Sequence, residues 1–324
     1  VAAGYLAKAG LKTLVLERRA NVGGGAITEE IHPEFRCSTL AHTTGPFSQK
    51  VATDLDLARY GLEFTKPAAR LTVLNPHGAS PTIYDDGPRT VASLKTLSAS
   101  DAASYGEFAT AFQRIGRVLM PLLSMTPPTI EKPAAGELWN LGKLGLSFRG
   151  LGKQDAFRLL RWGPMAVADL AAEWFESEVL RAAVAARGIS GAFAGPWSAG
   201  TSTGLLMQAA RDGQAIASAT AVKGGLGGIT HALAQAAINR GVEIRTGAEV
   251  AQIKTSANQA TTIVLDNGDE LPARAVVSNA DPRTTFLKLI DPLELDPNFL
   301  LKLKNYRAFG CVAKINLALS GFPA

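Results

Sequence analysis

Apolar residues follow two periods at the start of the chain, one helical and one typical of a strand. Small and apolar residues recur at helical spacing over residues 1–9. This pattern predicts a helix that ends at Gly10, because glycine readily adopts the backbone conformation of a helix C-terminal cap. The run LKTLVLE at residues 11–17 is typical of a short buried strand in a parallel sheet. A second extended stretch is expected over residues 26–31, where a His-Pro pair follows.

The pattern changes between about residues 71 and 213. Helical periods at residues 100–124, 154–173 and 176–186 alternate with loops rich in proline and glycine. The segment SMTPPTIEKP at residues 124–133 excludes a regular helix or a central strand, because proline lacks the backbone N–H that both require. The sequence therefore predicts a separate, mainly helical layer with surface loops.

Alternating helix and strand patterns return after Val222. The apolar residues of 229–239 fall on one helical face, and Asp-Asn-Gly at 266–268 is a strong signal for a tight hairpin turn. Strands are expected at residues 242–245, 249–255, 261–265 and 271–278. A long, partly alternating stretch at residues 306–320 predicts a further strand in the sheet of the middle layer.

Length and charge narrow the class of protein. The 324 residues are enough for two domains with substantial cores. The net charge of +5 comes from 33 basic and 28 acidic residues spread along the chain, with no basic block interleaved with aromatic residues. This distribution favours a mildly basic surface over nucleic-acid binding.

The cysteines and the apolar runs exclude several other classes. Cys37 and Cys311 match no metal-binding or redox spacing, which favours two reduced, buried thiols in a reducing compartment. No segment has the unbroken apolar length of a membrane span, since the best candidate, residues 115–125, contains Arg117 and Pro121.

A helix, a strand and an acidic residue follow one another in residues 1–17. In a dinucleotide-binding βαβ unit, the second strand ends in an acidic side chain that accepts hydrogen bonds from ribose hydroxyls, and Glu17 has this position. Arg18-Arg19 and the glycines of VGGGA follow directly. Glycines let backbone N–H groups approach an anion, and arginine can offset the charge of a phosphate. A surface glutamate and a flexible glycine loop are the alternative interpretations.

The stretch LAKAGLKTLVLERRANVGGGAITE resembles a segment of the FAD-dependent oxidoreductases of the phytoene desaturase and flavin amine oxidase superfamily. In these proteins the segment follows the glycine fingerprint of the first strand. The resemblance implies that Glu17 is the ribose-binding acid and that Arg19, Gly23 and Gly24 belong to the pyrophosphate side. Gly25 stands where amine oxidases usually carry an arginine, which favours the desaturase-like branch.

A second stretch, VKGGLGGITHALAQAAINRGVEIRTGAEVAQI, resembles the return from substrate domain to FAD domain in the same superfamily. By this resemblance the backbone of Val250 contacts the adenine, and SNADP at residues 278–282 lines the same side. HTTGPF at 42–47 and SGAFAGPWSAGTSTGLL at 190–206 resemble the phytoene dehydrogenase-related subgroup.

The resemblance implies an α/β fold in two domains. Residues 1–70 and 215–290 would form an incomplete, Rossmann-like FAD-binding domain of the GR2 type. Residues 71–214 and 291–324 would form an inserted α+β substrate domain. The implied activity is FAD-dependent removal of hydride from a small lipophilic, isoprenoid-like substrate. A flavin amine oxidase-like enzyme and a flavin-fold protein with a regulatory role are the alternatives.

Several expectations concern the surroundings of this site. No catalytic residue is assigned, although His42 lies at a position that could approach the flavin ring. Peripheral membrane contact is a further expectation, with residues 115–129 as its place and core packing as the alternative. The expected location is the cytoplasm for a bacterial protein and the mitochondrial matrix for a eukaryotic one. The oligomeric state is not predicted.

The chain begins without the strand and glycine fingerprint that the resemblance implies. We expect these to precede Val1 and a C-terminal FAD-binding segment to follow Ala324. The 324-residue chain alone is therefore expected to bind FAD weakly, to be unstable and to be inactive.

Overall fold

Helices and short strands alternate through the chain. The computed structural model describes residues 1–41, 44, 47–123, 125–129, 134–216, 220–257, 259–307 and 310–321. The helices are α1 (Ala2–Lys8), α2 (Gln49–Asp54), α3 (Gly87–Lys95), α4 (Ala99–Leu119), α5 (Ala135–Arg149), α6 (Gly152–Trp162), α7 (Val167–Trp174), α8 (Glu178–Gly188), α9 (Thr201–Asp212), α10 (Gly227–Ile238), α11 (Pro282–Thr284) and α12 (Pro297–Asn305). The strands are β1 (Leu14–Glu17), β2 (Thr28–His32), β3 (Phe35–Ser38), β4 (Phe64–Thr65), β5 (Ala69–Thr72), β6 (Thr82–Tyr84), β7 (Ala221–Val222), β8 (Glu243–Thr246), β9 (Val250–Ser256), β10 (Gln259–Leu265) and β11 (Glu270–Pro272). Short 3-10 helices are η1 (Gly24–Ala26), η2 (Leu57–Tyr60), η3 (Met120–Leu123) and η5 (Pro292–Glu294), and η4 (Thr285–Leu289) is a short π-helix.

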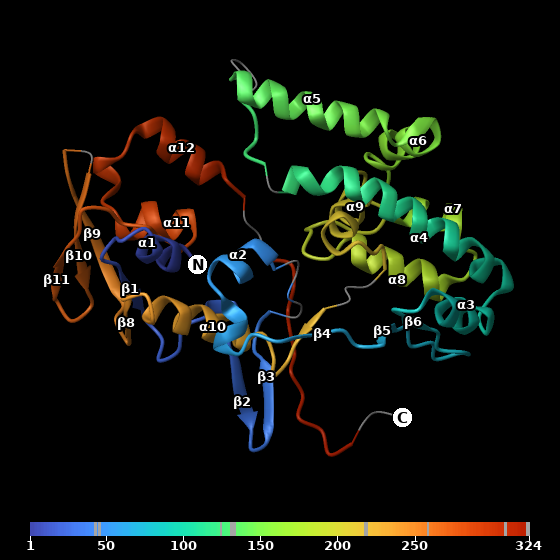
Figure 1. Cartoon of the computed structure of the whole chain (residues 1–324), viewed down its shortest axis with the longest axis horizontal. Helices are drawn as coiled ribbons and strands as arrows, with labels where there is room; N and C mark the ends of the chain where they lie inside the picture. Colours follow the sequence, from blue (N-terminus) through green and yellow to red (C-terminus); the bar gives the residue numbers. More distant parts are fainter. Residues whose placement is uncertain are drawn as a thin grey trace.

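The elements separate into an α/β group and a helical layer (Figure 1). Helices α3–α9 lie together on one side, and α1, α10–α12 and strands β1 and β8–β11 lie on the other. The hydrophobic core divides in the same way. One cluster of buried residues extends from Ile83 to Ile216, a second joins Leu55 to Leu62 with Val222 to Ala236, and a third lies between Ala248 and Leu265. Each group therefore buries apolar residues of its own.

The α/β group is built on two parallel strands, each preceded by a helix. β1 pairs with β8 in the register Leu14↔Glu243 to Glu17↔Thr246, and α1 packs against α10. Gly10 has a φ of 82° and donates its N–H to the carbonyl of Ala7, which ends α1. Positive φ is nearly free of strain in glycine, so the predicted cap at Gly10 is confirmed.

An antiparallel sheet, β11–β10–β9, continues the α/β group. The predicted turn at residues 266–268 joins β10 to β11, with Gly268 at a φ of 88°. The strand expected at residues 271–278 is largely wrong, because β11 ends at Pro272. The hydroxyl of Ser278 instead lies 2.7 Å from that of Thr285, where the chain turns into α11 and η4.

The helical layer surrounds α4, the longest helix. The rings of Phe108, Phe112 and Trp162 are fully buried, and Phe112 stacks on Trp162 with ring centroids 5.2 Å apart. The predicted helix at 154–173 is two helices, α6 and α7. Pro164 explains the break, since it follows Trp162 and Gly163 and cannot continue the hydrogen-bond ladder of α6.

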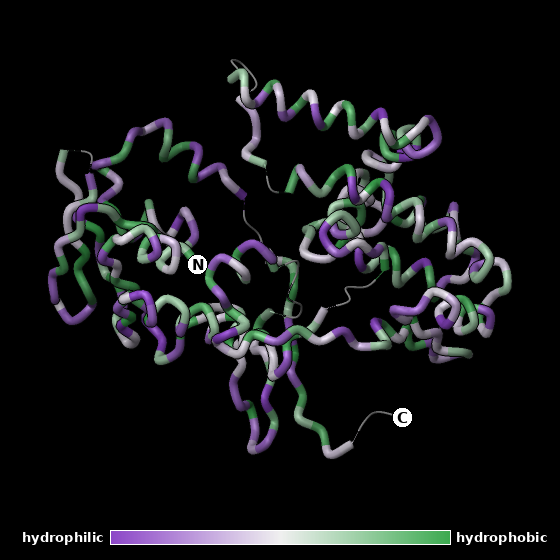
Figure 2. The backbone as a smooth tube through the Cα atoms, viewed as in Figure 1, coloured by the Kyte–Doolittle hydropathy of each residue, from purple (hydrophilic) through white to green (hydrophobic). Residues whose placement is uncertain are grey.

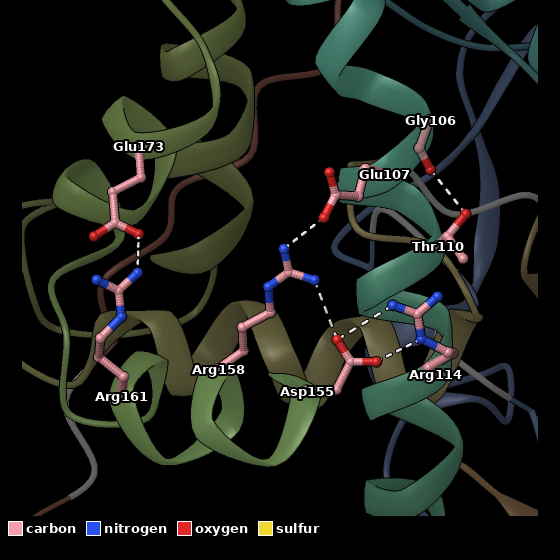
Figure 3. A network of polar contacts seen from close by, with 8 residues as sticks. All are labelled: Gly106, Glu107, Thr110, Arg114, Asp155, Arg158, Arg161 and Glu173. Atoms are coloured by element: carbon pink, nitrogen blue, oxygen red, sulfur yellow. Dashed lines mark hydrogen bonds and ion pairs between the residues drawn. The ribbon is translucent and has the colours of Figure 1, made fainter. Parts of the chain in front are cut away.

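A network of ion pairs ties α6 to α4 (Figure 3). Arg114 of α4 binds both carboxylate oxygens of Asp155, with Nη2 3.2 Å from Oδ1, and Arg158 Nη1 also lies 3.2 Å from Oδ1. Arg158 then reaches Glu107 of α4 at 2.6 Å. Arg161 pairs with Glu173, which joins α6 to α7. Asp155 is therefore the buried centre of the network, with 3% of its surface exposed.

The strand expected at residues 306–320 is wrong within the described part of that segment. Residues 310–320 form no strand, and the side chains of Lys314 and Asn316 contact residues 38–41 instead. Because side chains rather than the backbone reach those carbonyls, no ladder of backbone hydrogen bonds forms. The segment lies beside the end of β3 and not in the sheet of the middle layer.

Candidate functional site

Four structural elements place their ends at one edge of the β1–β8 pair. Since the strands are parallel, Glu17 and Thr246 end them at the same edge. Helices α1 and α10 each precede their strand through a short connection, so their N-terminal ends point toward this edge as well. The segments 18–25 and 247–250 begin here. In parallel α/β sheets, the carboxyl ends of the strands are where ligands bind.

The structure brings the segments of Glu17, Arg19 and Val250 together. The N–H of Ala248 donates to the carbonyl of Glu17, and that of Gly247 to the carbonyl of Arg19, both at 3.0 Å. Val250 begins β9 two residues later. Glu17 Oε1 accepts the N–H of Arg19 at 2.9 Å, which orients its carboxylate along the edge. Residues that are far apart in the chain thus form one continuous surface.

The glycine loop Gly23–Gly25 packs closely on α10. Gly23 has a φ of 135°, and a Cβ there would lie 2.7 Å from Thr230 Oγ1. Only glycine permits this approach. A Cβ on Gly25 would lie 3.2 Å from a methyl carbon of Leu40, whereas a Cβ on Gly24 would meet no described atom within 4 Å. Of the three, Gly24 is therefore the one with open space around it.

The hairpin β2–β3 caps the start of α10. Thr28 Oγ1 accepts the N–H of Gly227 at 2.9 Å, and Ser38 Oγ accepts that of Leu226 at 3.0 Å. A Cβ on Gly225 would lie 2.6 Å from Thr28 Oγ1, so the glycines of VKGGLGG allow the hairpin to approach. Sequence reasoning missed Thr28 and Ser38. Their signal was the density of glycines opposite them, which indicates close backbone contact.

A polar cluster fixes α1 beside α2. Asp54 accepts the hydroxyl of Tyr5 at 2.7 Å and the ammonium of Lys50 at 2.8 Å, and Lys8 donates to its backbone carbonyl. The hydrogen bonds from Lys50 and Tyr5 hold the pKa of Asp54 below its ordinary value. Because α1 leads into β1, this cluster also positions the strand that ends at Glu17.

Lys314 joins the far end of the chain to the glycine loop. Its ammonium donates to the carbonyls of Ser38 and Ala41, the latter at 3.0 Å, and Asn316 Nδ2 donates to the carbonyl of Thr39 at 3.1 Å. The N–H of Ala41 in turn donates to the carbonyl of Gly25 at 2.8 Å. Sequence reasoning missed this lysine, which lies 276 residues from Ser38.

Replacing Lys314 with alanine is expected to lower the free energy of unfolding by about 2 kcal/mol, because hydrogen bonds from a charged group are stronger than neutral ones. Chemical denaturation measures this difference. Lys12→Ala, at an exposed position, is the control and should stay within about 0.5 kcal/mol of the unmodified chain. Equal losses in the two variants would contradict the role given to Lys314.

His42, Thr43, Gly45 and Pro46, which include the histidine considered near the flavin ring, lie outside the described residues. Among the described residues, no group of three or more histidine, cysteine, aspartate or glutamate side chains is arranged to hold a metal ion.

Nearly the whole chain matches a known family. The model of the family described as flavin containing amine oxidoreductase matches residues 1–321, and the chain belongs to this family. The predicted superfamily is thereby confirmed. Membership supports FAD as the cofactor and oxidation–reduction as the chemistry of the family.

Individual relatives agree with this assignment. The chain is 30% identical over 342 residues to "Pyridine nucleotide-disulfide oxidoreductase domain-containing protein 2" of Mus musculus, covering 100% of the chain and 58% of that protein. It is 26% identical over 317 residues to one of the subunits of limonene dehydrogenase from Castellaniella defragrans, covering 94% of the chain and 53% of that protein. The chain therefore spans less than two thirds of the length of these relatives.

A solved structure shares the fold. The crystal structure of an oxidoreductase from Methanosarcina mazei superposes with a TM-score of 0.56 at 18% identity. The match covers 94% of this chain and 61% of the solved one. The α/β character predicted from the sequence is confirmed at this level.

Proposed function

We propose that the chain is part of an FAD-dependent oxidoreductase that removes hydride from a small lipophilic, isoprenoid-like substrate. The proposal rests mainly on one observation. Glu17, Arg19 and the segment before Val250 meet at one edge of the strand pair, at the carboxyl ends of β1 and β8. Flavin supplies the redox chemistry in such an enzyme, and the protein supplies binding, orientation and exclusion of water.

The residues at this edge fit a flavin dinucleotide. Glu17 uses Oε1 to accept the N–H of Arg19, and Oε2 has no partner among the described residues, so it can accept a ribose hydroxyl. The guanidinium of Arg19 is exposed and can offset the charge of the pyrophosphate. Gly24 has the open surroundings that a close approach of phosphate to the backbone requires. Val250 would contact the adenine through its backbone.

The proposed domains follow the same division. Residues 1–70 and 215–290 would form the FAD-binding domain, a Rossmann-like unit of the GR2 type, around the β1–β8 pair. Residues 71–214 and 291–324 would form the substrate domain, for which the buried aromatic cluster of the helical layer supplies the scaffold. In support, most of the first hydrophobic cluster belongs to the middle segment and the second to the flanking ones.

The substrate class rests on composition and on one relative. Limonene is a hydrocarbon built from isoprene units, and the name of one relative of this chain identifies it as part of a limonene dehydrogenase. Gly25 at the position where amine oxidases usually carry arginine also favours this branch over amine oxidation.

Replacing Glu17 with glutamine is expected to weaken FAD binding about tenfold, because the variant loses a charged acceptor for the ribose hydroxyls. Quenching of flavin fluorescence during titration measures the affinity. Glu243→Gln is the matched control, since Glu243 lies at the opposite end of the same strand pair. Equal affinities of the Glu17→Gln variant and the unmodified chain would contradict the role of Glu17.

Amine oxidation is the second candidate function, and the description of the matched family favours it. Anaerobic reduction of the flavin bound to the complete enzyme, of which this chain is part, separates the two candidates. Loss of the oxidised flavin spectrum with terpenoid or carotenoid substrates, and not with primary amines, is expected from the first proposal. Reduction by amines alone would support the second candidate instead.

A further inference from the structure

Helix α5 exposes apolar side chains over its whole described length. None of its residues from Ala135 to Arg149 is buried, and Leu138, Trp139 and Leu146 are 55%, 67% and 69% exposed. Figure 1 shows α5 as the outermost helix of the layer, above α4, and α6 follows it in the chain. Figure 2 shows hydrophobic residues along this outer helix. Water-exposed apolar residues gathered in one place commonly mark an interaction surface.

The exposed residues of α5 form adjacent stripes. Trp139, Lys143 and Leu146 follow one another at intervals of four and three residues, so they lie on one side of the helix. Leu144 and Phe148 are half-buried and face the rest of the layer. Helix α6 packs against α5 and exposes apolar side chains of its own, since Phe157 is 65% and Leu160 is 68% exposed. We call the exposed residues of α5 and α6 the outer apolar surface.

Positively charged residues lie on the same two helices as these exposed apolar residues. Lys143, Arg149 and Lys153 are exposed and have no acidic partner within the described ranges. The ammonium of Lys143 lies 5.4 Å from the ring centroid of Trp139. The only acidic side chain of α5, Glu137, accepts the N–H of Ala134 at the start of the helix. The surface is thus apolar and cationic together.

The combination of apolar and cationic residues distinguishes between two binding partners, a second copy of the chain and an anionic lipid surface. A second copy of the chain meeting the same surface would bring lysine and arginine against lysine and arginine, which is unfavourable. An anionic lipid surface would accept the tryptophan and leucine side chains into its interfacial region and attract the cations. Aromatic residues with an apolar ring and a polar group suit that depth.

We propose that α5 and the exposed face of α6 bind the protein to an anionic lipid surface. The helix lies along the surface: 15 residues span about 22 Å, less than the hydrocarbon thickness of a bilayer. Crossing a bilayer demands more length and apolar character than any helix in the described ranges has. Residues 115–129, the expected place of contact, begin inside the core, because Ile115 is fully buried. The proposal is independent of the substrate.

Co-sedimentation with vesicles tests the proposal. The complete protein of which the chain is part is expected to bind vesicles of phosphatidylglycerol and phosphatidylcholine and to bind vesicles of phosphatidylcholine alone much more weakly. Leu146→Glu should lower the partition coefficient at least about tenfold, because a side chain of this size loses its burial in the interface. Lys143→Gln and Arg149→Gln should each lower it about fivefold. Leu293→Glu is the control, since Leu293 is 92% exposed on η5.

Tryptophan fluorescence gives a second measurement. On addition of the anionic vesicles, the emission of the chain should shift to shorter wavelength as Trp139 leaves water. Trp139→Phe should lose this shift, whereas Trp197→Phe should keep it, although Trp197 is 72% exposed.

Three results would overturn the proposal. The first is equal binding of the Leu146→Glu variant and the unmodified chain to anionic vesicles. The second is equal binding of the unmodified chain to both kinds of vesicle. The third is an oligomer that Leu146→Glu dissociates while vesicle binding is absent, which would assign the surface to a second copy. Because α5 buries no residue, these variants should melt at the temperature of the unmodified chain, and the Lys143→Gln variant repeats the test without an apolar change.

Discussion

Replacing Gly204 with alanine is expected to make the chain about 2 kcal/mol less stable than the same replacement at Gly145, because both glycines lie in helices but only at Gly204 does an added Cβ meet backbone atoms. At Gly204 of α9, a Cβ would lie 2.4 Å from the carbonyl oxygen of Gly188 at the end of α8. Real Cβ atoms do not approach backbone oxygen so closely, so the helices would have to separate. Gly188 itself is confined, because a Cβ there would lie 2.6 Å from a methyl carbon of Val167.

Gly145 supplies the matched control for this prediction. It lies within the exposed helix α5, and a Cβ there would meet no described atom within 4 Å. Alanine favours helix more than glycine does, so Gly145→Ala should raise the free energy of unfolding by up to about 1 kcal/mol. At Gly204 the cost of overpacking, about 2 kcal/mol, should exceed this gain. Urea denaturation of both variants measures the difference, and similar stabilities would show that α8 and α9 do not cross so closely.

Local sequence signals predicted most of the α/β group. The cap at Gly10, the turn at residues 266–268 and the helix at 229–239 each depend on a few neighbouring residues with a strong conformational preference. The structure has all three. The signals for these elements lie within a few neighbouring residues, which is why one sequence suffices to find them, although tertiary packing stabilises them.

Elements that depend on distant partners were harder to predict. The alternating pattern at residues 306–320 satisfies the requirement of a strand. In the described part of the segment, however, the side chains of Lys314 and Asn316 donate to backbone carbonyls at residues 38–41, and the backbone pairs with no strand edge. The break at Pro164 is different, because its signal was present in the sequence and a long helical period obscured it. The region was correctly predicted as a mainly helical layer, but helices α3, α5 and α9 lie outside the helical periods at residues 100–124, 154–173 and 176–186 and went unpredicted.

In the candidate site, too, some features were predicted from the sequence and others, which depend on distant partners, were not. The resemblance to known flavoproteins placed Glu17 and Val250 on one site, and the parallel pairing of β1 and β8 brings their segments together. The glycines were given one role, proximity to phosphate. The structure gives Gly23 a second one, packing against Thr230, that no sequence pattern distinguishes from the first. Lys314 was missed because nothing in its own neighbourhood marks residues 38–41 as its partners.

Replacing Asp155 with asparagine is expected to lower the free energy of unfolding by about 2 kcal/mol at neutral pH, because Arg114 and Arg158 then lose their shared anion. The cost is below the 3–5 kcal/mol typical of a fully buried pair, since the side chain of Arg114 is 41% exposed and water can solvate it. Glu173→Gln is the control in the same network (Figure 3). Its pair with Arg161 is exposed on both sides, so the change should be at most about 0.5 kcal/mol.

The pH dependence of the same variant provides the sharper test. Hydrogen bonds from Arg114, with a smaller contribution from Arg158, hold the pKa of Asp155 below its ordinary value, although burial opposes them. A carboxyl group with a depressed pKa stabilises the fold above its unfolded pKa, about 4, and loses that contribution as the pH falls toward its folded pKa. The gap in stability between the unmodified chain and Asp155→Asn should therefore be constant near neutral pH and narrow below about pH 4. A gap that stays constant through this range would mean that packing around Asp155, and not its charge, joins α6 to α4.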